Sequence, residues 1–495
     1  MLRYVGLAVG AVLVASTAAC SASSADTGSI RVAVTYPDVW GEPMKAAAKL
    51  YEEAHPGTEI KIEELPADSA DDSLQTSFIG GAAPDLVQLS PPTLTDFGGR
   101  GFLEPLTTIL DENAEGGAPW RESFTGTTLP SLRAQNGEEY GIPWSQINVQ
   151  LLTRADSLAA IGLDAPPATW DESLKANDAW LAKGIQPLYA GFAGNDGALW
   201  WRTTLMLNAL FRPYTEDINL LHADGWTYDS SNPDTVAGEV YSADELYVAF
   251  KKGITDPAKS PEYRKAIELM LQLKPAVQSD VASWTPEESH NKFDRGEVAQ
   301  GYGLASDIAA RVKASEDAGL GTPTLVQSNF PTITKEDWPG LTEGGSNPLA
   351  SVRFAWSVNA ASKDKTLAED FLKFITQPEV TTKIYAAGFF PEDGTYGIGD
   401  TTAIDGVVYP EGSNLDPTPV ETIPELTVYG FGLPPTYDTQ DFDQWNSQFL
   451  NLWTGVITLD EFLAQRSESN LAALTRNLDV FAADIDQKFI DENTK

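Results

Sequence analysis

Residues 30–35 are IRVAVT, residues 59–64 are EIKIEE and residues 85–89 are DLVQL, and these three runs decide the fold. Their β-branched and alternating apolar residues predict a β-strand in each run. Between them, the spacing of apolar residues predicts helices over 43–55 and 73–79, the first with a proline in its first turn. The order strand, helix, strand, helix, strand predicts an α/β fold with a largely parallel sheet, in which ligands bind at the carboxyl ends of the strands.

Upstream of these strands, a short apolar leader predicts export from the cell. Arg3 precedes an almost entirely apolar run over 5–14, and residues 15–19 are small, which is the pattern of a bacterial signal peptide. About ten apolar residues are too few to span a bilayer, which takes about 20. We therefore expect a signal peptide over 1–19.

The single cysteine of the chain, Cys20, comes directly after this leader. A cysteine there resembles a lipobox, in which the thiol is acylated and the leader is cut just before it, although Thr17 stands where a lipobox usually has leucine. The alternative is an ordinary secretory signal beside a chance cysteine. A secreted protein that used disulfides would carry an even set of cysteines, which favours the lipoprotein. We expect lipidation of Cys20, a tether over 20–28, and a location at the extracellular face of the cell membrane.

Composition limits what the anchored body can be. The chain has 71 acidic and 33 basic residues and a net charge of −38. Such a surface repels phosphate backbones and anionic lipid headgroups, so we expect no nucleic acid partner and contact with the membrane through the lipid anchor only. Because 495 residues exceed what one core usually supports, two lobes are expected.

Seven short segments, in this order, resemble the carbohydrate-binding proteins of ABC importers, the maltose-binding-protein cluster of extracellular solute-binding proteins (family 1). They are YEEAHPG at 51–57, GGAAPDLV at 80–87, GFLEPL at 101–106, NGEEYGIP at 136–143, PPATWDE at 166–172, FDRGEVA at 293–299 and AEDFLKFIT at 368–376. Each segment alone is weak evidence, but their order covers most of residues 30–380.

The resemblance implies a two-lobed periplasmic-binding-protein-like fold (type II), with discontinuous lobes, a hinge and a ligand cleft between the lobes. Closure by hinge bending is the motion expected of such proteins. The expected lobes are N-terminal, over 28–143 plus 328–376, and C-terminal, over 144–327 plus 377–495. Extra sequence at 212–259 and 409–443 is rich in turn-forming residues and predicts loops or subdomains.

A cleft that holds a sugar needs flat aromatic rings for the apolar faces of the sugar and polar groups for its hydroxyls. The chain has 13 tryptophans, and the alternative for each of them is packing in a core. Neighbouring residues on a helix point about 100° apart, so one of Trp200 and Trp201 can face a cleft while the other packs. The candidate ligand-binding residues are Tyr36, Asp38, Trp40, Ser90, Trp144, Gln146, Asn148, Asn195, Trp200, Trp201, Trp284, Tyr302 and Trp356.

Catalytic and metal-binding patterns do not emerge from the sequence. His55, His222 and His290 are scattered without metal-ligand spacing. Neither a Gly-x-Ser-x-Gly elbow nor a phosphate-binding loop is present. We expect no enzyme activity, no cofactor and no metal, although 71 carboxylates make it impossible to recognise a glycosidase pair by counting.

The sequence therefore predicts a monomeric, lipid-anchored binding protein that captures a carbohydrate, in particular an oligosaccharide, and delivers it to an ABC permease. Two alternatives stay open: a secreted enzyme that acts on a polysaccharide, and a binding protein for another solute such as a polyamine. The sequence identifies neither the sugar nor the permease.

Overall fold

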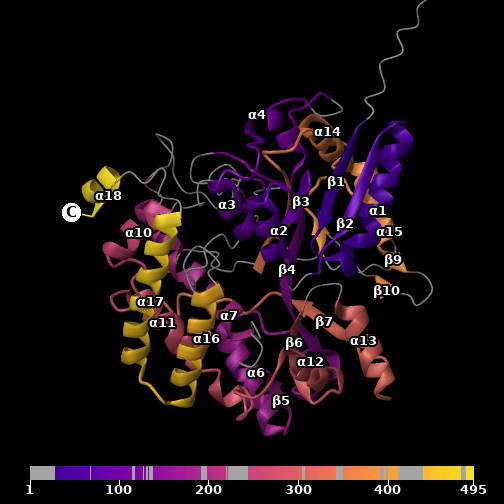
Figure 1. Cartoon of the computed structure of the whole chain (residues 1–495). Helices are drawn as coiled ribbons and strands as arrows, with labels where there is room; N and C mark the ends of the chain where they lie inside the picture. The colour runs from indigo at the N-terminus through magenta and orange to yellow at the C-terminus, as the bar shows by residue number, and fades with distance from the viewer. Residues whose placement is uncertain are drawn as a thin grey trace, which may run out of the picture.

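The computed structural model shows two lobes that share one long strand (Figure 1). It describes residues 28–66, 69–113, 117–125, 128–129, 132, 138–190, 198–218, 220, 243–303, 307–341, 349–390, 395–396, 400–410, 439–480 and 487–494. Cys20 and the leader lie outside these residues. In the described part of the chain, no helix is long and apolar enough to cross a membrane.

The three predicted strands form one side of the N-terminal sheet, and their positions are confirmed to within about a residue. They are β1 (Ser29–Val34), β2 (Glu59–Glu64) and β3 (Leu86–Leu89), which pair in parallel in the order β2-β1-β3. The sheet continues with β8 (Leu349–Val358) and β4 (Ile142–Arg154), which pair antiparallel to their neighbours. The sheet is therefore mixed, because two later segments return to complete it.

Strand β4 joins the two sheets. Its residues from Ile142 to Val149 pair with β8 in the N-terminal sheet. Its residues from Gln150 to Thr153 pair on one side with β6 (Val298–Gly303), and those from Leu151 to Arg154 pair on the other with β7 (Leu325–Ser328). A third strand, β5 (Gln186–Leu188), extends the second sheet in parallel with β6. The lobes thus meet near Val149 and Gln150, not at the predicted boundary after residue 143.

The N-terminal lobe also takes up a late segment of the chain that we expected in the other lobe. Helices α14 (Lys365–Ile375) and α15 (Pro378–Ala387) pack with α1 (Pro37–Ala54) in one apolar core. Strand β11 (Thr401–Thr402) pairs with β4 opposite Gln146 and Ser145. The predicted boundary at 376/377 therefore differs from the structure, in which residues 378–404 contribute to the N-terminal core. Helix α1 also begins earlier than predicted, so Pro43 lies inside it.

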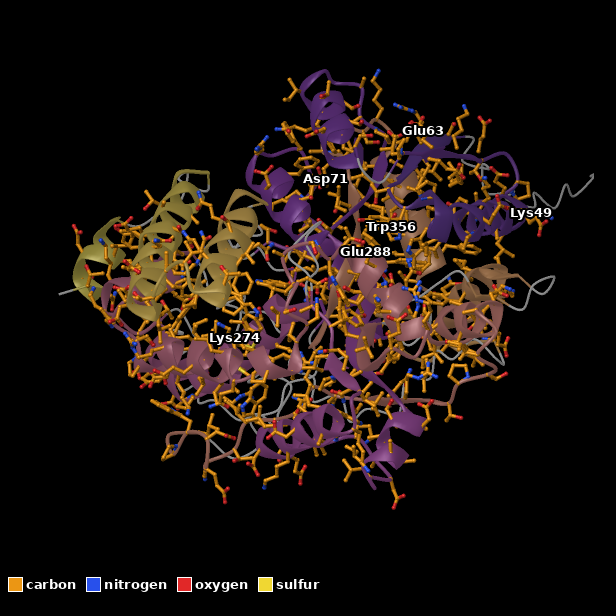
Figure 2. All side chains as sticks on the ribbon, turned by 90° about the horizontal axis from the view of Figure 1, so that it is seen from below. Lys49, Glu63, Asp71, Lys274, Glu288 and Trp356 are labelled. Atoms are coloured by element: carbon orange, nitrogen blue, oxygen red, sulfur yellow. The ribbon has the colours of Figure 1, made fainter. Side chains whose placement is uncertain are left out.

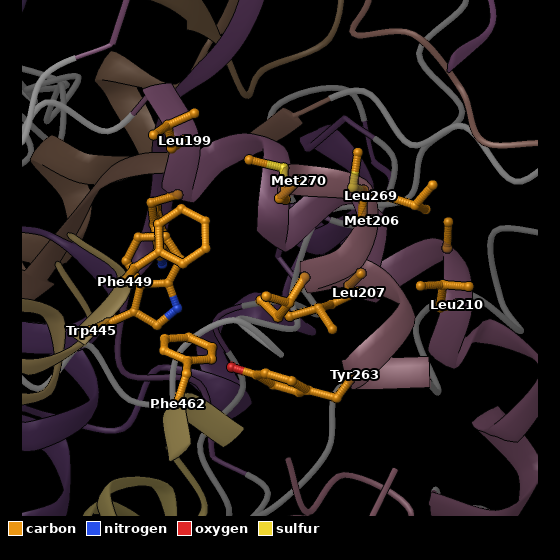
Figure 3. Close-up of a cluster of buried hydrophobic side chains, with 14 of the residues drawn as sticks. Leu199, Met206, Leu207, Leu210, Tyr263, Leu269, Met270, Trp445, Phe449 and Phe462 are labelled. Atoms are coloured by element: carbon orange, nitrogen blue, oxygen red, sulfur yellow. The ribbon is translucent and has the colours of Figure 1, made fainter. Parts of the chain in front are cut away.

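The C-terminal lobe is built mainly from helices around a large apolar core, part of which Figure 3 shows. Trp445, Phe449 and Phe462 pack there against residues from the middle of the chain such as Leu207 and Met270. The helices that contribute are α6 (Trp170–Ala182), α7 (Ala198–Phe211), α8 (Thr215–Ile218), α10 (Ala243–Lys251), α11 (Pro261–Leu271), α16 (Thr439–Thr454) and α17 (Leu459–Val480). The extra segment at 212–259 therefore adds helices to this core. Most of the segment at 409–443 lies outside the described residues.

Shorter elements cover the remaining surfaces of both lobes. They are α2 (Ala70–Ile79), α3 (Pro91–Gly99), α4 (Thr107–Leu110), η2 (Trp120–Ser123), α5 (Ala155–Ala160), η4 (Arg212–Tyr214), η6 (Lys274–Ala276), α12 (Pro286–Asp294), α13 (Asp307–Asp317), β9 (Phe389–Phe390), β10 (Thr395–Tyr396) and α18 (Gln487–Asn493).

Candidate functional site

Three of the predicted tryptophans form one buried group in the N-terminal lobe. Trp40, Trp144 and Trp356 are each 0% exposed. The ring centroids of Trp40 and Trp144 lie 5.7 Å apart, and those of Trp144 and Trp356 lie 6.4 Å apart. Tyr385 of α15 completes the group at 5.5 Å from Trp40. In Figure 2, Trp356 is labelled near the centre of the view and Lys49 at its edge. The three rings therefore belong to the core, contrary to the expectation that they stack against a ligand.

The start of β4, which carries Trp144, is irregular. The pairing of β4 with β8 shifts register between Pro143 and Ser145 and again between Ser145 and Gln146. Such irregularities bend a strand and re-aim its side chains. Trp144 packs in the core while Gln146, two residues later, stays half-buried and donates from Nε2 to the carbonyl oxygen of Thr402 at 2.9 Å.

A group of polar and aromatic side chains, all accessible except the fully buried Asp400, lies above this core, at the carboxyl end of β1. We call Tyr36, Gln146, Arg353 and Asp400 the Tyr36 cluster. Tyr36 is 36% exposed, and its ring centroid lies 4.7 Å from that of Phe354 and 5.4 Å from the guanidinium carbon of Arg353. Nη1 of Arg353 donates to Oδ1 of Asp400 at 2.7 Å. Gln146 joins the cluster because it pairs with Val352, the neighbour of Arg353, and with Thr401, the neighbour of Asp400.

Ser90 occupies the predicted place after β3, and a carboxylate that the sequence analysis did not name lies close to it. The Oγ of Ser90 is 3.0 Å from Oγ1 of Thr93. Thr93 in turn donates to Oδ2 of Asp71 on α2 at 2.8 Å. Ser90 therefore belongs to a chain of hydrogen bonds that ends on an ionisable group at the same edge of the sheet.

In the C-terminal lobe, the candidate residue Tyr302 is half-buried. It lies on β6, with Tyr189 after β5 and His290 of α12 around it, and we call these three the aromatic triad. The ring centroids are 5.8 Å apart for Tyr189 and Tyr302, 6.0 Å for His290 and Tyr302, and 6.1 Å for Tyr189 and His290. Trp284 is half-buried nearby and packs, like Tyr302, against the apolar cluster that contains Tyr189. Nζ of Lys292 lies 5.7 Å from the centroid of the Trp284 ring.

The other predicted residues divide into one that is buried and four on which the structure is silent. Trp200 is 4% exposed and packs in the C-terminal core, which is the alternative to ligand binding that the sequence left open for each tryptophan. Asp38 lies in the first turn of α1, Asn148 on β4 and Trp201 in the first turn of α7, and the description of the structure does not extend to their side chains. Asn195 lies outside the described residues.

Helix α7 brings to the region a set of polar residues that the sequence analysis missed. Arg202 is 7% exposed, and its guanidinium carbon lies 5.0 Å from the ring centroid of Phe330. Burial lowers the pKa of Arg202 from 12.5 to about 10, because desolvation disfavours the charged form. Thr204 and Asn208 are also buried on this helix, and within the described chain the Thr204 hydroxyl and both amide atoms of Asn208 have no hydrogen-bond partner. In the sequence, Trp200 and Trp201 indicate this helix as a candidate for ligand binding, but no motif indicates Arg202 beside them.

Together these groups offer aromatic rings, hydroxyls, amides, carboxylates and guanidinium groups on both sides of β4. Tyr302 pairs with Leu151 of β4, and Gln146 lies five residues earlier on the same strand. At about 3.3 Å per residue these two positions are about 17 Å apart, so the Tyr36 cluster and the aromatic triad lie on different lobes. Among the described residues, no group of three or more His, Cys, Asp or Glu side chains could hold a metal ion.

Comparison with known families gives one family model, described as a bacterial extracellular solute-binding protein, which matches residues 37–382. Among curated proteins, a provisionally named binding protein of Brucella abortus is 31% identical over 159 residues, which are 32% of this chain and 37% of that protein. A lipoprotein of Streptomyces antibioticus, uncharacterised and encoded upstream of oleD, is 28% identical over 174 residues, 33% of this chain and 36% of that protein. These alignments span just over a third of the length of the relatives.

Solved structures match over nearly their whole length. The solute receptor AcbH, whose title reports an exclusive preference for β-D-galactopyranose, superposes with a TM-score of 0.63 at 14% identity and covers 91% of this chain and 99% of its own. The binding protein RafE in complex with raffinose has a TM-score of 0.56 at 17% identity, with 90% and 99% covered. A chitin oligosaccharide binding protein has a TM-score of 0.59 at 19% identity, also with 90% and 99% covered. At these identities the likeness establishes the two-lobed fold.

Proposed function

Because the chain belongs to the family of bacterial extracellular solute-binding proteins, we propose that it is the carbohydrate-binding component of an ABC importer. Its ligand is an oligosaccharide that binds between the two lobes, and a permease in the membrane is its partner. Among the solved structures with the same fold, RafE holds raffinose and another binds chitin oligosaccharide, which supports a sugar of more than one unit, whereas AcbH prefers the single sugar β-D-galactopyranose.

One observation carries the proposal: each lobe has accessible aromatic and polar side chains close to the strand that the lobes share. The Tyr36 cluster supplies a tyrosine ring, an amide and a guanidinium group that the buried carboxylate of Asp400 holds in place. The aromatic triad adds tyrosine and histidine rings from the other lobe. A saccharide that reaches both sets buries its apolar ring faces against tyrosine and pairs its hydroxyls with the polar groups.

Binding of this kind depends on complete hydrogen bonding. A desolvated hydroxyl without a partner costs about 1–3 kcal/mol, so the polar groups select sugars whose hydroxyls they can satisfy. Most of the favourable free energy comes from the apolar faces buried against the rings, at about 25 cal/mol per Å².

Closure around the ligand takes place at the junction between the lobes. The junction consists of β4 near Val149 and of the connection between β7 and β8, which leads from the second sheet back to the first. Bending there brings the Tyr36 cluster and the aromatic triad onto one ligand, and the permease recognises the closed form.

We also propose that Cys20 is acylated and that the protein is anchored at the outer face of the cell membrane. The leader, the position of the cysteine and the lipoprotein relative from Streptomyces antibioticus support this. Several acyl chains, at about 0.8 kcal/mol per buried CH₂, give stable anchoring where one chain does not.

A screen of the purified protein against mono- and oligosaccharides tests the proposal. Intrinsic tryptophan and tyrosine fluorescence detects binding, titration calorimetry gives the stoichiometry, and chromatography of the sugar after incubation reports cleavage. We expect one sugar per chain, recovered intact. Hydrolysis of the sugar would make the protein an enzyme, and a response only to cations or polyamines would move it to another class of solute.

A further inference from the structure

Arg202 is a buried cation that no carboxylate among the described residues neutralises. Arg202 is 7% exposed, and its guanidinium carbon lies 5.0 Å from the centroid of the Phe330 ring. Across the described part of the chain it takes part in no ion pair with a carboxylate and in no side-chain hydrogen bond. Tyr189 of the aromatic triad is close enough to interact with its charge.

Two other buried arginines of this chain, Arg154 and Arg466, have polar partners in the protein. Arg154 pairs with Asp156 at 3.3 Å and donates to the carbonyl oxygen of Phe293 at 3.5 Å. Arg466, which is fully buried, donates to Oε1 of Gln448 at 3.2 Å and to Oδ1 of Asn470. Buried charges in proteins are as a rule paired or hydrogen-bonded, because desolvation of an ion without polar partners is costly. Arg202 departs from a rule that the same chain follows elsewhere.

The position of Arg202 connects it to the ligand site. One turn further along α7, Leu205 packs on the apolar cluster of Val149, Leu151 and Phe330, where β4 passes from one lobe to the other. Tyr302 packs on the same cluster. The guanidinium group therefore lies at the junction of the lobes and beside the aromatic triad.

We infer that the ligand is an acidic saccharide whose anionic group pairs with Arg202. This inference rests on the proposed function and adds to it the chemical class of the sugar. The planar guanidinium group matches a carboxylate or a sulfate with two parallel hydrogen bonds, and a dry environment strengthens that pair. Uronic acids and sulfated sugars both supply such an anion.

The net charge of −38 affects the approach of such a ligand but not the contact itself. Charges at the protein surface are screened beyond about 8–10 Å in ordinary buffers, whereas a buried pair is screened much less. The acidic surface therefore slows association of an anionic sugar at low ionic strength. Added salt raises the association rate and leaves the dissociation rate nearly unchanged, which is the opposite of electrostatic steering.

Titration of the purified full chain with matched saccharides tests the inference. The set holds a uronate-bearing oligosaccharide, its carboxyl-reduced neutral counterpart of the same linkage and length, and a sulfated analogue. We expect the tighter-binding of the two acidic sugars to bind at least about 30-fold more tightly than the neutral one. Removal of the anionic group from the sugar leaves the Arg202 guanidinium group buried and unpaired. Whether the uronate-bearing or the sulfated saccharide binds more tightly identifies which anionic group pairs with Arg202.

Substitution of the arginine separates a ligand contact from a structural role. Arg202→Met should abolish the preference for the acidic sugar, while the ligand-free protein unfolds at the same or a higher urea concentration. Arg264→Gln is the control, because Arg264 pairs with exposed Asp460 at the surface and its loss should leave sugar affinity unchanged.

Three results would overturn the inference. A neutral sugar that binds at least as tightly as its acidic counterpart contradicts it while the proposed function stands. A lowered urea midpoint in Arg202→Met with an unchanged affinity ratio makes the arginine structural. Binding of none of the saccharides refutes the proposed function as well. Should Arg202→Met fail to fold, the affinity ratio of the unmodified protein still decides.

Discussion

Tyr36 and Tyr302 allow the ligand site to be tested one residue at a time. Tyr36→Ala and Tyr302→Ala each remove a ring from one side of β4, and we expect each to weaken sugar binding by about 1–2 kcal/mol, or about 5- to 30-fold. Calorimetry of the two variants measures this. Tyr247→Ala serves as a matched control, because Tyr247 is also half-buried but packs far from β4, on α10. Equal losses in all three variants would indicate a general effect on folding and contradict the assignment.

Asp294 gives a second prediction at the scale of the residue, this time for pH. Its Oδ2 accepts from Nη1 of Arg311 at 2.9 Å, yet burial raises the pKa of Asp294 to about 6, against the opposing influence of Arg311 and Arg154. An acid whose pKa is higher in the folded than in the unfolded protein stabilises the fold below the unfolded pKa of about 3.8, and this contribution is lost as the pH rises through 6. Relative to the unmodified protein, Asp294→Asn should therefore gain stability between pH 4 and pH 7. Urea unfolding across this range measures the difference, and a difference that does not change with pH would refute it.

Side-chain orientation is where sequence reasoning reached its limit. Trp40, Trp144 and Trp356 were as compatible with a ligand site as with a core, because an aromatic ring suits both. Which applies depends on the register shifts of β4 and on the packing of α15, and neither leaves a local pattern in the sequence. Tyr302 was named from the segment that precedes it and stays a prediction, whereas no motif in the sequence marks Arg202.

At the scale of the element, the glycine at the start of β4 is a sensitive position. A Cβ at Gly141 would lie 2.2 Å from Cδ1 of Leu94 and 3.2 Å from Cβ of Ala355. Gly141→Ala should therefore destabilise the protein by about 1–3 kcal/mol, as overpacking of a core does. Urea denaturation of the variant measures the loss. Gly80→Ala is the control, because the nearest atom to a Cβ there is 3.3 Å away at an exposed helix end, and an equal loss in both variants would contradict the steric explanation.

Elements whose signal is local were predicted well. The three strands β1, β2 and β3 follow from apolar runs in the sequence. Elements that depend on distant partners were not. The return of β8 and β11 to the N-terminal sheet rests on pairings across more than 200 residues, which a single sequence does not encode in any readable pattern.

At the scale of the whole molecule, the anchor is separable from the binding lobes. Cys20→Ala should release a folded protein into the medium, because the acylation site is lost while the two cores begin only beyond residue 28. Fractionation of cells and medium, followed by a sugar titration of the released protein, measures this. A variant that stays with the membrane would show that something other than acylation of Cys20 holds the protein there.

The central claim is that a saccharide binds between the lobes, in contact with both of them. A crystal structure of the protein with the tightest-binding saccharide of the screen tests this most directly. The account predicts one sugar molecule beside β4, with the Tyr36 cluster on one side and Tyr302 on the other. A sugar found on a single lobe, away from both sets of residues, would contradict it.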